Sequence, residues 1–214
     1  MLRALVVLSL IAVAGIAALV LSPTTGRTLL NALDANAATR AGDAAARVTP
    51  ALQRDLKPLG LQIGAPVFVR IFKREGELEL WMAGRDGGYT LFRTYPICRY
   101  SGDLGPKRRQ GDNQAPEGFY RVARGQLNPA SRYHLAFNLG YPNAYERAHG
   151  YTGDFLMVHG SCVSIGCYAM GDAAIEEIYT LADAALRAGQ PAFEVHAFPF
   201  RLDAAALAGE RGSP

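Results

Sequence analysis

Alternating apolar and polar residues predict a run of three strands. Residues 66–73 (PVFVRIFK) alternate and are rich in β-branched and aromatic side chains, which is typical of a strand. A Glu75-Gly76 turn leads into residues 77–83 (ELELWMA), and Asp86-Gly87-Gly88 leads into residues 89–97 (YTLFRTYPI). The pattern therefore predicts two consecutive hairpins of an antiparallel sheet.

The rest of the chain adds strands and one clear helix. The further strand candidates are Gly118–Val122, Tyr133–Leu139, Phe155–His159, Gly166–Met170 and Phe193–Phe198. The helix follows from an apolar face of period 3.6, made by Ile175, Ile178, Leu181, Ala182, Ala185 and Leu186. Asp172 is expected to cap this helix and Gly189 to end it. Together these segments indicate a mainly β domain with a few helices.

The N-terminal segment is strongly apolar. Residues 4–21 follow Arg3 and carry no charge, a length close to the minimum for a membrane-spanning helix. We therefore predict that residues 1–22 are an uncleaved membrane anchor, with a cleaved signal peptide as the alternative. With Arg3 on the cytoplasmic side, the rest of the chain lies outside the cytoplasm.

Three further segments complete the expected organisation. Residues 23–48 are rich in Ala, Arg, Asp and Thr, and they are predicted to be a linker with weak helical propensity. Thr49-Pro50 has the pattern of a helix start, so a short helix is expected there. We place the folded domain at residues 49–201 and predict a flexible tail at residues 202–214.

Charge gives little reason to expect a nucleic-acid partner. The formal net charge is +3, and both signs are dispersed along the chain. One cationic run, Lys107-Arg108-Arg109, lies in a polar loop at residues 101–114. We expect this run to be an exposed loop tip, and the alternative is that it steers an anionic substrate.

Candidate chemistry is concentrated in FLMVHGSCVSIGCYAM, residues 155–170. This stretch holds His159, Cys162 and Cys167, and the chain has three cysteines in all. Outside the cytoplasm cysteines tend to pair, so an odd number leaves one free, metal-bound or paired with another chain. Three interpretations are open: a metal site, a structural cluster with a disulfide, or a nucleophile with its base.

The first two interpretations need additional partners. A tetrahedral zinc site would need a fourth ligand, which His134, His149 or His196 could supply. The spacing matches no paired CxxC knuckle. A structural cluster would need a disulfide between two of the three cysteines.

The third interpretation agrees with the local pattern. An apolar strand ends at His159, where the chain turns at Gly160. A second turn places Gly166 immediately before Cys167, which would relieve backbone crowding and let the amides of both residues point at one spot, as an oxyanion site requires. A cysteine at a strand start, close to a histidine at a neighbouring strand end, is the arrangement that an acyl-transfer thiol needs.

These residues resemble the signature of the L,D-transpeptidase (YkuD-type) catalytic domain. In that family an HG pair, here His159-Gly160, precedes an S-x-G-C turn, here Ser164-Ile165-Gly166-Cys167. The segment APEGFY (115–120) resembles the Pro-x-Gly-aromatic start of a strand in the family, and the order of the motifs is similar to the YafK-type branch. The resemblance extends from about Pro66 to Arg201. It implies a β-sandwich or barrel-like catalytic domain behind the N-terminal segment.

The resemblance implies a role for each residue of the signature. Cys167 would be the nucleophile and His159 the general base, with its imidazole oriented by the backbone carbonyl of Gly160. The amides of Gly166 and Cys167 would bind the oxyanion, and Ser164 would shape the turn. No metal and no cofactor are expected.

The same resemblance gives Cys162 no catalytic role. Cys162 lacks a preceding glycine, and we predict that it pairs with Cys98, which leaves one free thiol. The alternative is a Cys162–Cys167 bond that acts as a redox latch. The chain departs from the family at Tyr168-Ala169, where an apolar residue and an arginine usually follow the nucleophile and the arginine helps to hold its loop.

The activity that the resemblance implies is that of an envelope enzyme on the periplasmic side, acting on peptidoglycan stem peptides. Such an enzyme forms a cysteine thioester, releases a D-residue and passes the acyl group to an amine. The product is a 3→3 crosslink or a protein–peptidoglycan link. With water as acceptor the same site is a hydrolase, which cleaves L,D bonds or releases a peptidoglycan-linked lipoprotein. An inactive peptidoglycan-binding module is a further alternative.

Three side chains are candidates for substrate contact. Tyr141 and Tyr145 lie in the loop YPNAYERAHG (141–150), ahead of the strand that carries His159. This loop is either a packed turn or a rim that recognises the peptide. His134 lies in a predicted strand that would approach the cleft in the family pattern.

Overall fold

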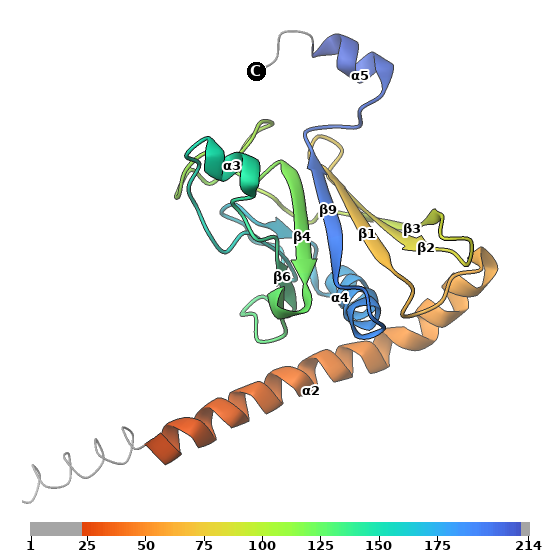
Figure 1. Ribbon diagram of the computed structural model, residues 1–214, viewed down its shortest axis with the longest axis vertical. Helices are drawn as coiled ribbons and strands as arrows, with labels where there is room; N and C mark the ends of the chain where they lie inside the picture. Colours follow the sequence, from red (N-terminus) through yellow and green to blue (C-terminus); the bar gives the residue numbers. More distant parts are fainter. Residues whose placement is uncertain (1–22, 211–214) are drawn as a thin grey trace, which may run out of the picture. The chain divides into compact units, whose positions relative to one another are not determined.

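The computed structural model describes residues 23–210 (Figure 1). The helices are α2 (Pro23–Leu56), α3 (Ala144–Ala148), α4 (Asp172–Arg187) and α5 (Ala204–Gly209), and the 3-10 turns are η1 (Lys57–Leu59) and η2 (Arg124–Gln126). The strands are β1 (Val67–Phe72), β2 (Glu77–Ala83), β3 (Tyr89–Pro96), β4 (Gly118–Ala123), β5 (Leu127–Asn128), β6 (Ala136–Asn138), β7 (Met157–His159), β8 (Tyr168–Ala169) and β9 (Ala192–Phe198). The compact unit that holds these strands begins at Ala41, and the predicted class, mainly β with a few helices, is confirmed.

The larger sheet has the strand order β3-β2-β1-β9-β4. Strand β1 is parallel to β9, and the other neighbouring strands are antiparallel. The alternation in β1 buries Val69, which lies beside Leu80 of β2 and Val195 of β9, and Tyr120 of β4 continues this row. The predicted hairpins are therefore confirmed. The parallel pair, which local pattern does not indicate, joins them to the last strand of the chain.

The smaller sheet has the order β5-β6-β7-β8 and consists of strands of two or three residues. Its strands are shorter than the predicted segments for a conformational reason. His134 and Phe155 have φ values of 69° and 52°, in the left-handed region, so neither residue continues a strand. As a result β6 begins only at Ala136 and β7 only at Met157.

Helix α4 packs against both sheets, through β1 and β9 of the larger one and β6 and β7 of the smaller one (Figure 1). The predicted apolar face is buried, as shown for Ile175, Ile178, Leu181, Ala182 and Ala185. Gly189 follows the last turn with φ of 111°, which ends the helix as predicted. Burial of this face therefore fixes α4 against the strands that carry the motifs.

The predicted helix start near Pro50 is wrong, and the segment predicted to be a linker is helical. Residues 23–48 are helical, and Pro50 lies inside the continuous helix α2. Near its end, Ala44, Leu52 and Leu56 are buried in the hydrophobic core of the compact unit. Burial of these side chains outweighs the one backbone hydrogen bond that a proline cannot donate.

The sequence prediction also misses two short helices. Asn143 caps α3 by accepting the amide of Glu146, whose carboxylate accepts the amide of Asn143 in return. Within the predicted tail, residues 202–214, Asp203 caps α5 by accepting the amide of Ala206. Both helices begin with capping patterns that are visible in the sequence, so a search for N-caps would have found them.

The predicted membrane anchor or signal, residues 1–22, lies outside the described residues, as do residues 211–214. Between residues 23 and 210 no helix is both long enough and apolar enough to cross a membrane.

One disulfide ties the two sheets together. Cys98 follows β3 of the larger sheet and Cys162 follows β7 of the smaller one, with Cα atoms 5.4 Å apart and a sequence separation of 64. Cys167 is the free cysteine. The bond therefore closes a long loop of the chain and holds the turn after β7 against the larger sheet.

We predict that the double variant Cys98→Ser/Cys162→Ser lowers the free energy of unfolding by about 2 to 4 kcal/mol, because the unfolded chain loses a long closed loop. Urea unfolding followed by circular dichroism measures the change. The wild-type chain treated with reductant serves as the matched control and should lose the same amount. An unchanged midpoint in both would contradict the prediction.

Candidate active site

His159 ends β7 and is almost fully buried. Its Nδ1 lies 2.6 Å from the backbone oxygen of the next residue, Gly160. Because a carbonyl oxygen can only accept, this contact assigns the ring proton to Nδ1 and leaves Nε2 as a proton acceptor. Burial lowers the pKa of the His159 imidazole below its ordinary value, and the hydrogen bond to Gly160 opposes this shift. The ring is therefore neutral at neutral pH, the form that a general base requires.

Cys167 comes immediately before β8 and is half-buried. Its Sγ lies 3.7 Å from the carbonyl oxygen of Phe155, toward which the thiol donates. Burial raises the pKa of the Cys167 thiol, while the Met157 amide and the charge of Lys107 act in the opposite direction. The resting thiol is therefore protonated at neutral pH, and a base has to remove its proton before it can attack.

The parallel pairing of β7 with β8 brings these two side chains to one face. Val158 lies opposite Tyr168, and His159 lies opposite Ala169. Because side chains alternate along a strand, Val158 and Tyr168 face the core, whereas His159 and Cys167 share the other face. Both residues line one cavity of about 580 Å³.

Loops form most of this cavity. Besides His159, its lining comes from residues within 107–113, 128–133, 154–157 and 165–167. The ring of Tyr133 stacks on the His159 ring, with centroids 4.8 Å apart and planes inclined by 28°. A larger hollow, about 950 Å³, lies beside η1 and the β2–β3 turn, but no histidine or cysteine lines it. The smaller cavity is therefore the candidate active site.

Ser164 holds the turn before the thiol. Its hydroxyl donates to the carbonyl oxygen of Cys167 at 2.7 Å and accepts the amide of Gly166 at 3.1 Å. Gly166 has φ of 138°, and the nearest atom to an added Cβ would be 3.5 Å away. Backbone conformation, not the crowding expected from the sequence, therefore requires this glycine. Because the Gly166 amide donates within the turn, the Cys167 amide is the better candidate for the oxyanion site.

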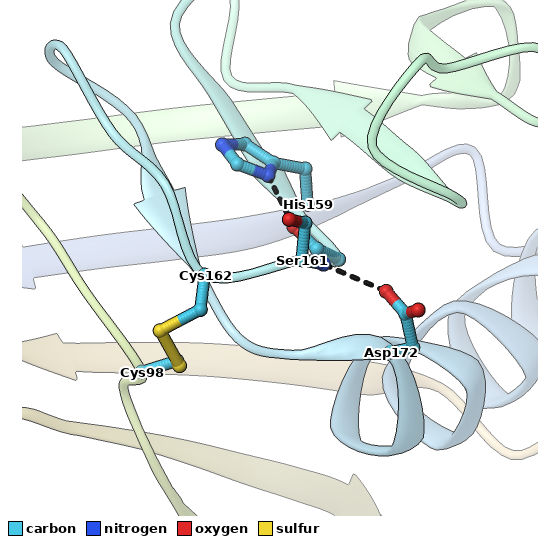
Figure 2. The surroundings of a disulfide bond; sticks show 6 residues. Cys98, His159, Ser161, Cys162 and Asp172 are labelled. Carbon is cyan, nitrogen blue, oxygen red and sulfur yellow. Dashed lines mark hydrogen bonds between the residues drawn. A yellow bond between two sulfur atoms is a disulfide. The ribbon is translucent and has the colours of Figure 1, made fainter.

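The turn after β7 is held from two sides, as Figure 2 shows. On one side the amide of Ser161 donates to Oδ1 of Asp172 at 2.7 Å, and on the other Cys162 is bonded to Cys98. The predicted role of Asp172 as a helix cap is wrong, since Gly171 occupies the N-cap position of α4. The Asp172 carboxylate holds the turn instead.

Gly160 is required in this turn because of space. A Cβ on Gly160 would lie 2.7 Å from Oδ1 of Asp172 and 2.7 Å from the backbone oxygen of Tyr133. Its amide also donates to the carbonyl oxygen of Leu135 at 3.0 Å. The peptide that contacts His159 is thus packed too closely for any other residue.

The sequence matches one family over residues 71–192, the YkuD family, described as the L,D-transpeptidase catalytic domain. The chain belongs to this family. The matched residues include both His159 and Cys167, so the cavity described above lies within the YkuD domain.

Curated relatives and solved structures resemble this YkuD chain to different degrees. The proteins named "Putative L,D-transpeptidase YafK" from Escherichia coli K12 and O157:H7 are each 54% identical over 140 residues, 65% of this chain and 56% of theirs. The chain thus spans little more than half the length of these relatives. The helical cell shape determining protein Pgp2 (K307A mutant) of Campylobacter jejuni is 24% identical with a TM-score of 0.49, covering 68% of this chain and 54% of that one. Bdellovibrio bacteriovorus Bd1075 is 18% identical with a TM-score of 0.43, and the match covers 64% of this chain and 49% of that one.

The three predicted substrate contacts lie outside the lining of the YkuD cavity. Tyr141 is buried, and its hydroxyl donates to the carbonyl oxygen of Lys107 at 3.0 Å. Tyr145 is exposed and packs on His149, with ring centroids 4.0 Å apart. His134 has its Nε2 2.7 Å from Oε1 of Glu176. Their role in binding substrate stays a prediction.

The cationic run in the polar loop is exposed only in part. Arg108 and Arg109 are exposed, but Lys107 is 3% exposed and lines the cavity. Its ammonium pairs with Asp112 and donates to the carbonyl oxygen of Arg109. The expectation of an exposed tip is therefore wrong for Lys107, because the loop folds back over its side chain.

A second buried lysine fixes the start of the same loop. The fully buried ammonium of Lys73 donates to the carbonyl oxygens of Asp103 and Ala115, at 2.6 and 3.1 Å. It also forms an ion pair with Glu117 at 3.0 Å. Burial lowers the pKa of Lys73, and the Glu117 carboxylate opposes that shift. These contacts hold a wall of the cavity in place.

The disulfide removes the basis of the metal interpretation. A zinc site of the predicted kind needs the Cys162 thiolate, and in this structure that sulfur is bonded to Cys98. The histidines at 149 and 196 lie in other settings, beside Tyr145 and Phe119. Within residues 23–210 no group of three His, Cys, Asp or Glu side chains is arranged to hold a metal ion.

We predict that the rate of Cys167 alkylation by iodoacetamide is still rising with pH at about pH 8.5, the ordinary pKa of a thiol. The reason is that burial raises the pKa of this thiol. Intact-mass spectrometry of the oxidised protein, which has one free thiol, measures the rate. The His159→Ala variant is the control and should show a similar profile. A rate that levels off below pH 8 in the wild type, but not in the control, would indicate a resting thiolate–imidazolium pair and contradict the prediction.

Proposed function

We propose that this chain is a peptidoglycan-acting L,D-transpeptidase in which Cys167 is the nucleophile and His159 the general base. The observation that supports this most is the fixed tautomer of His159. Its Nδ1 proton is directed at the Gly160 carbonyl, so Nε2 is available to a thiol on the same face of the sheet. The chain's membership of the YkuD family gives the reaction class, and the sequence similarity to YafK points to the same class.

Acylation begins with proton transfer from the Cys167 thiol to Nε2 of His159. The thiolate then attacks the carbonyl carbon of the L-centre of a stem peptide, and its carbonyl oxygen becomes an oxyanion. The Cys167 amide donates to that oxyanion. Collapse breaks the bond to the following D-residue, whose nitrogen takes the proton from His159, and a thioester remains on Cys167.

Deacylation uses the same groups in reverse. An amine or a water molecule loses a proton to the neutral His159 and attacks the thioester. The Cys167 thiolate then leaves and takes that proton back from His159. An amine acceptor gives a 3→3 crosslink or a protein–peptidoglycan link. Water gives a hydrolysed peptide or a released lipoprotein. The acceptor that reaches the thioester first therefore decides between transferase and hydrolase.

The proposed site of action is the periplasmic side of the cell envelope. Peptidoglycan stem peptides are found there, and the Cys98–Cys162 disulfide is typical of an oxidising compartment. The uncharged segment at residues 4–21 would serve as the anchor or signal that takes the domain there.

We predict that Cys167→Ala lowers turnover of diaminopimelate-containing muropeptides by more than about a thousandfold, because the thioester cannot form. The full chain is incubated with muropeptides, with and without an amine acceptor, and masses of protein and products are recorded. The wild type should gain an acyl adduct on Cys167 and release a D-residue.

The double variant Cys98→Ser/Cys162→Ser provides the matched control. It removes two cysteines near the site and the bond that holds the turn after β7 but keeps Cys167, so the folded variant should still gain the acyl adduct, at a lower rate than the wild type. Turnover by folded Cys167→Ala at the wild-type rate would refute the proposed mechanism. A folded wild type that gains no adduct would favour a peptidoglycan-binding module.

A further inference from the structure

One peptide unit joins two contacts on opposite sides of the turn after β7. The carbonyl oxygen of Gly160 and the amide of Ser161 belong to the same peptide bond. In a trans peptide these two groups point in opposite directions. On one side the oxygen lies 2.6 Å from Nδ1 of His159, and on the other the amide donates to Oδ1 of Asp172 at 2.7 Å (Figure 2). The rotation of this single plane therefore sets both contacts.

The backbone alone would not favour this orientation. Ser161 has φ of 58°, in the left-handed region that residues other than glycine seldom adopt. Two contacts hold it there: the Asp172 carboxylate on its amide, and the amide of Gly171, which donates to the carbonyl oxygen of Ser161 at 2.8 Å. Both partners come from the start of α4. The helix thus imposes a peptide conformation that the sequence of the turn would not select by itself.

Asp172 is placed by the helix that carries it, although the residue itself is exposed to solvent. It is the first residue of α4, a helix packed against both sheets. Its Oδ1 lies where a Cβ on Gly160 would come within 2.7 Å, so the carboxylate is in close contact with the peptide it holds. A carboxylate in the first turn of a helix is also favoured by the helix dipole. The packed helix and this close contact therefore bring the acceptor to the Ser161 amide.

We propose that Asp172 is a positioning residue for the general base. It acts on His159 through the Gly160–Ser161 peptide: by fixing the amide on one side, it aims the carbonyl at Nδ1 on the other. The imidazole is then held in one tautomer and one orientation, with Nε2 presented to the thiol of Cys167. This inference rests on the proposed function, because it assigns Asp172 a part in the same reaction.

Two substitutions separate the position of the acceptor from its charge. Asp172→Asn keeps an oxygen at the same place and should retain acylation of Cys167 within about threefold of the wild type. Asp172→Glu keeps the charge and suits the first turn of a helix, but its extra methylene displaces the oxygen. We expect Asp172→Glu to lower kcat for acylation by more than tenfold, with KM changed less than twofold.

Nitrogen-15 NMR of the His159 ring gives a readout that a merely structural role would not change. In the wild type and in Asp172→Asn the proton should be on Nδ1, whereas Asp172→Glu should show a mixture of tautomers. Thermal unfolding verifies that each variant is folded. Asp183→Ala is the control, since it removes a carboxylate of α4 that pairs with Arg187, and it should change neither rate nor tautomer.

Wild-type acylation rates in Asp172→Glu, or a slower rate with the Nδ1 tautomer intact, would overturn the inference. The inference would also be overturned if Asp172→Asn lost as much activity as Asp172→Glu. The position of the acceptor oxygen would then not determine the acylation rate. Absence of any Cys167 adduct in the wild type would count against the proposed function instead. In that case the tautomers alone still test whether Asp172 positions His159.

Discussion

The parallel pairing of β7 with β8 is the constraint on which the site depends. An extended chain would place His159 and Cys167 about 26 Å apart, at roughly 3.3 Å for each residue. Parallel neighbours usually need a connection of about a dozen residues or more, and this connection is shorter, at residues 160–167. The chain makes so tight a return because several contacts hold it: Asp172 on the first turn, the Cys98–Cys162 bond beyond it, and Ser164 on the turn before the thiol.

Burial then sets the chemistry of the pair. In a poorly solvated setting charge separation is costly, so burial lowers the pKa of His159 and raises that of Cys167. Both groups are therefore neutral at rest, and in the proposed mechanism the thiolate arises as its proton moves to the imidazole. The nearby ammonium of Lys107 is paired with Asp112, which limits its influence on the thiol.

Buried polar contacts also order the walls of the cavity. Two buried lysines, Lys73 and Lys107, hold the loop at residues 101–117 through carbonyl oxygens and carboxylates rather than facing solvent. This loop supplies part of the cavity lining. Tyr133, from another loop, stacks on the His159 ring and limits its motion.

The sequence by itself determined whatever depends on neighbouring residues: the alternating strands of the larger sheet, the apolar face of α4, and the HG and S-x-G-C motifs that mark the candidate site. Prediction from the sequence failed where contacts between distant segments of the chain determine the local structure. Burial of Leu52 and Leu56 carries a helix through Pro50, the left-handed residues at 134 and 155 shorten two strands, and a folded loop buries Lys107. The local sequence pattern also gave no indication that Tyr133 stacks on His159 or that Asp172 accepts the amide of Ser161. Periodicity and turn residues report local hydrogen bonding, whereas the packing partners of a side chain come from parts of the chain that only the tertiary structure brings together.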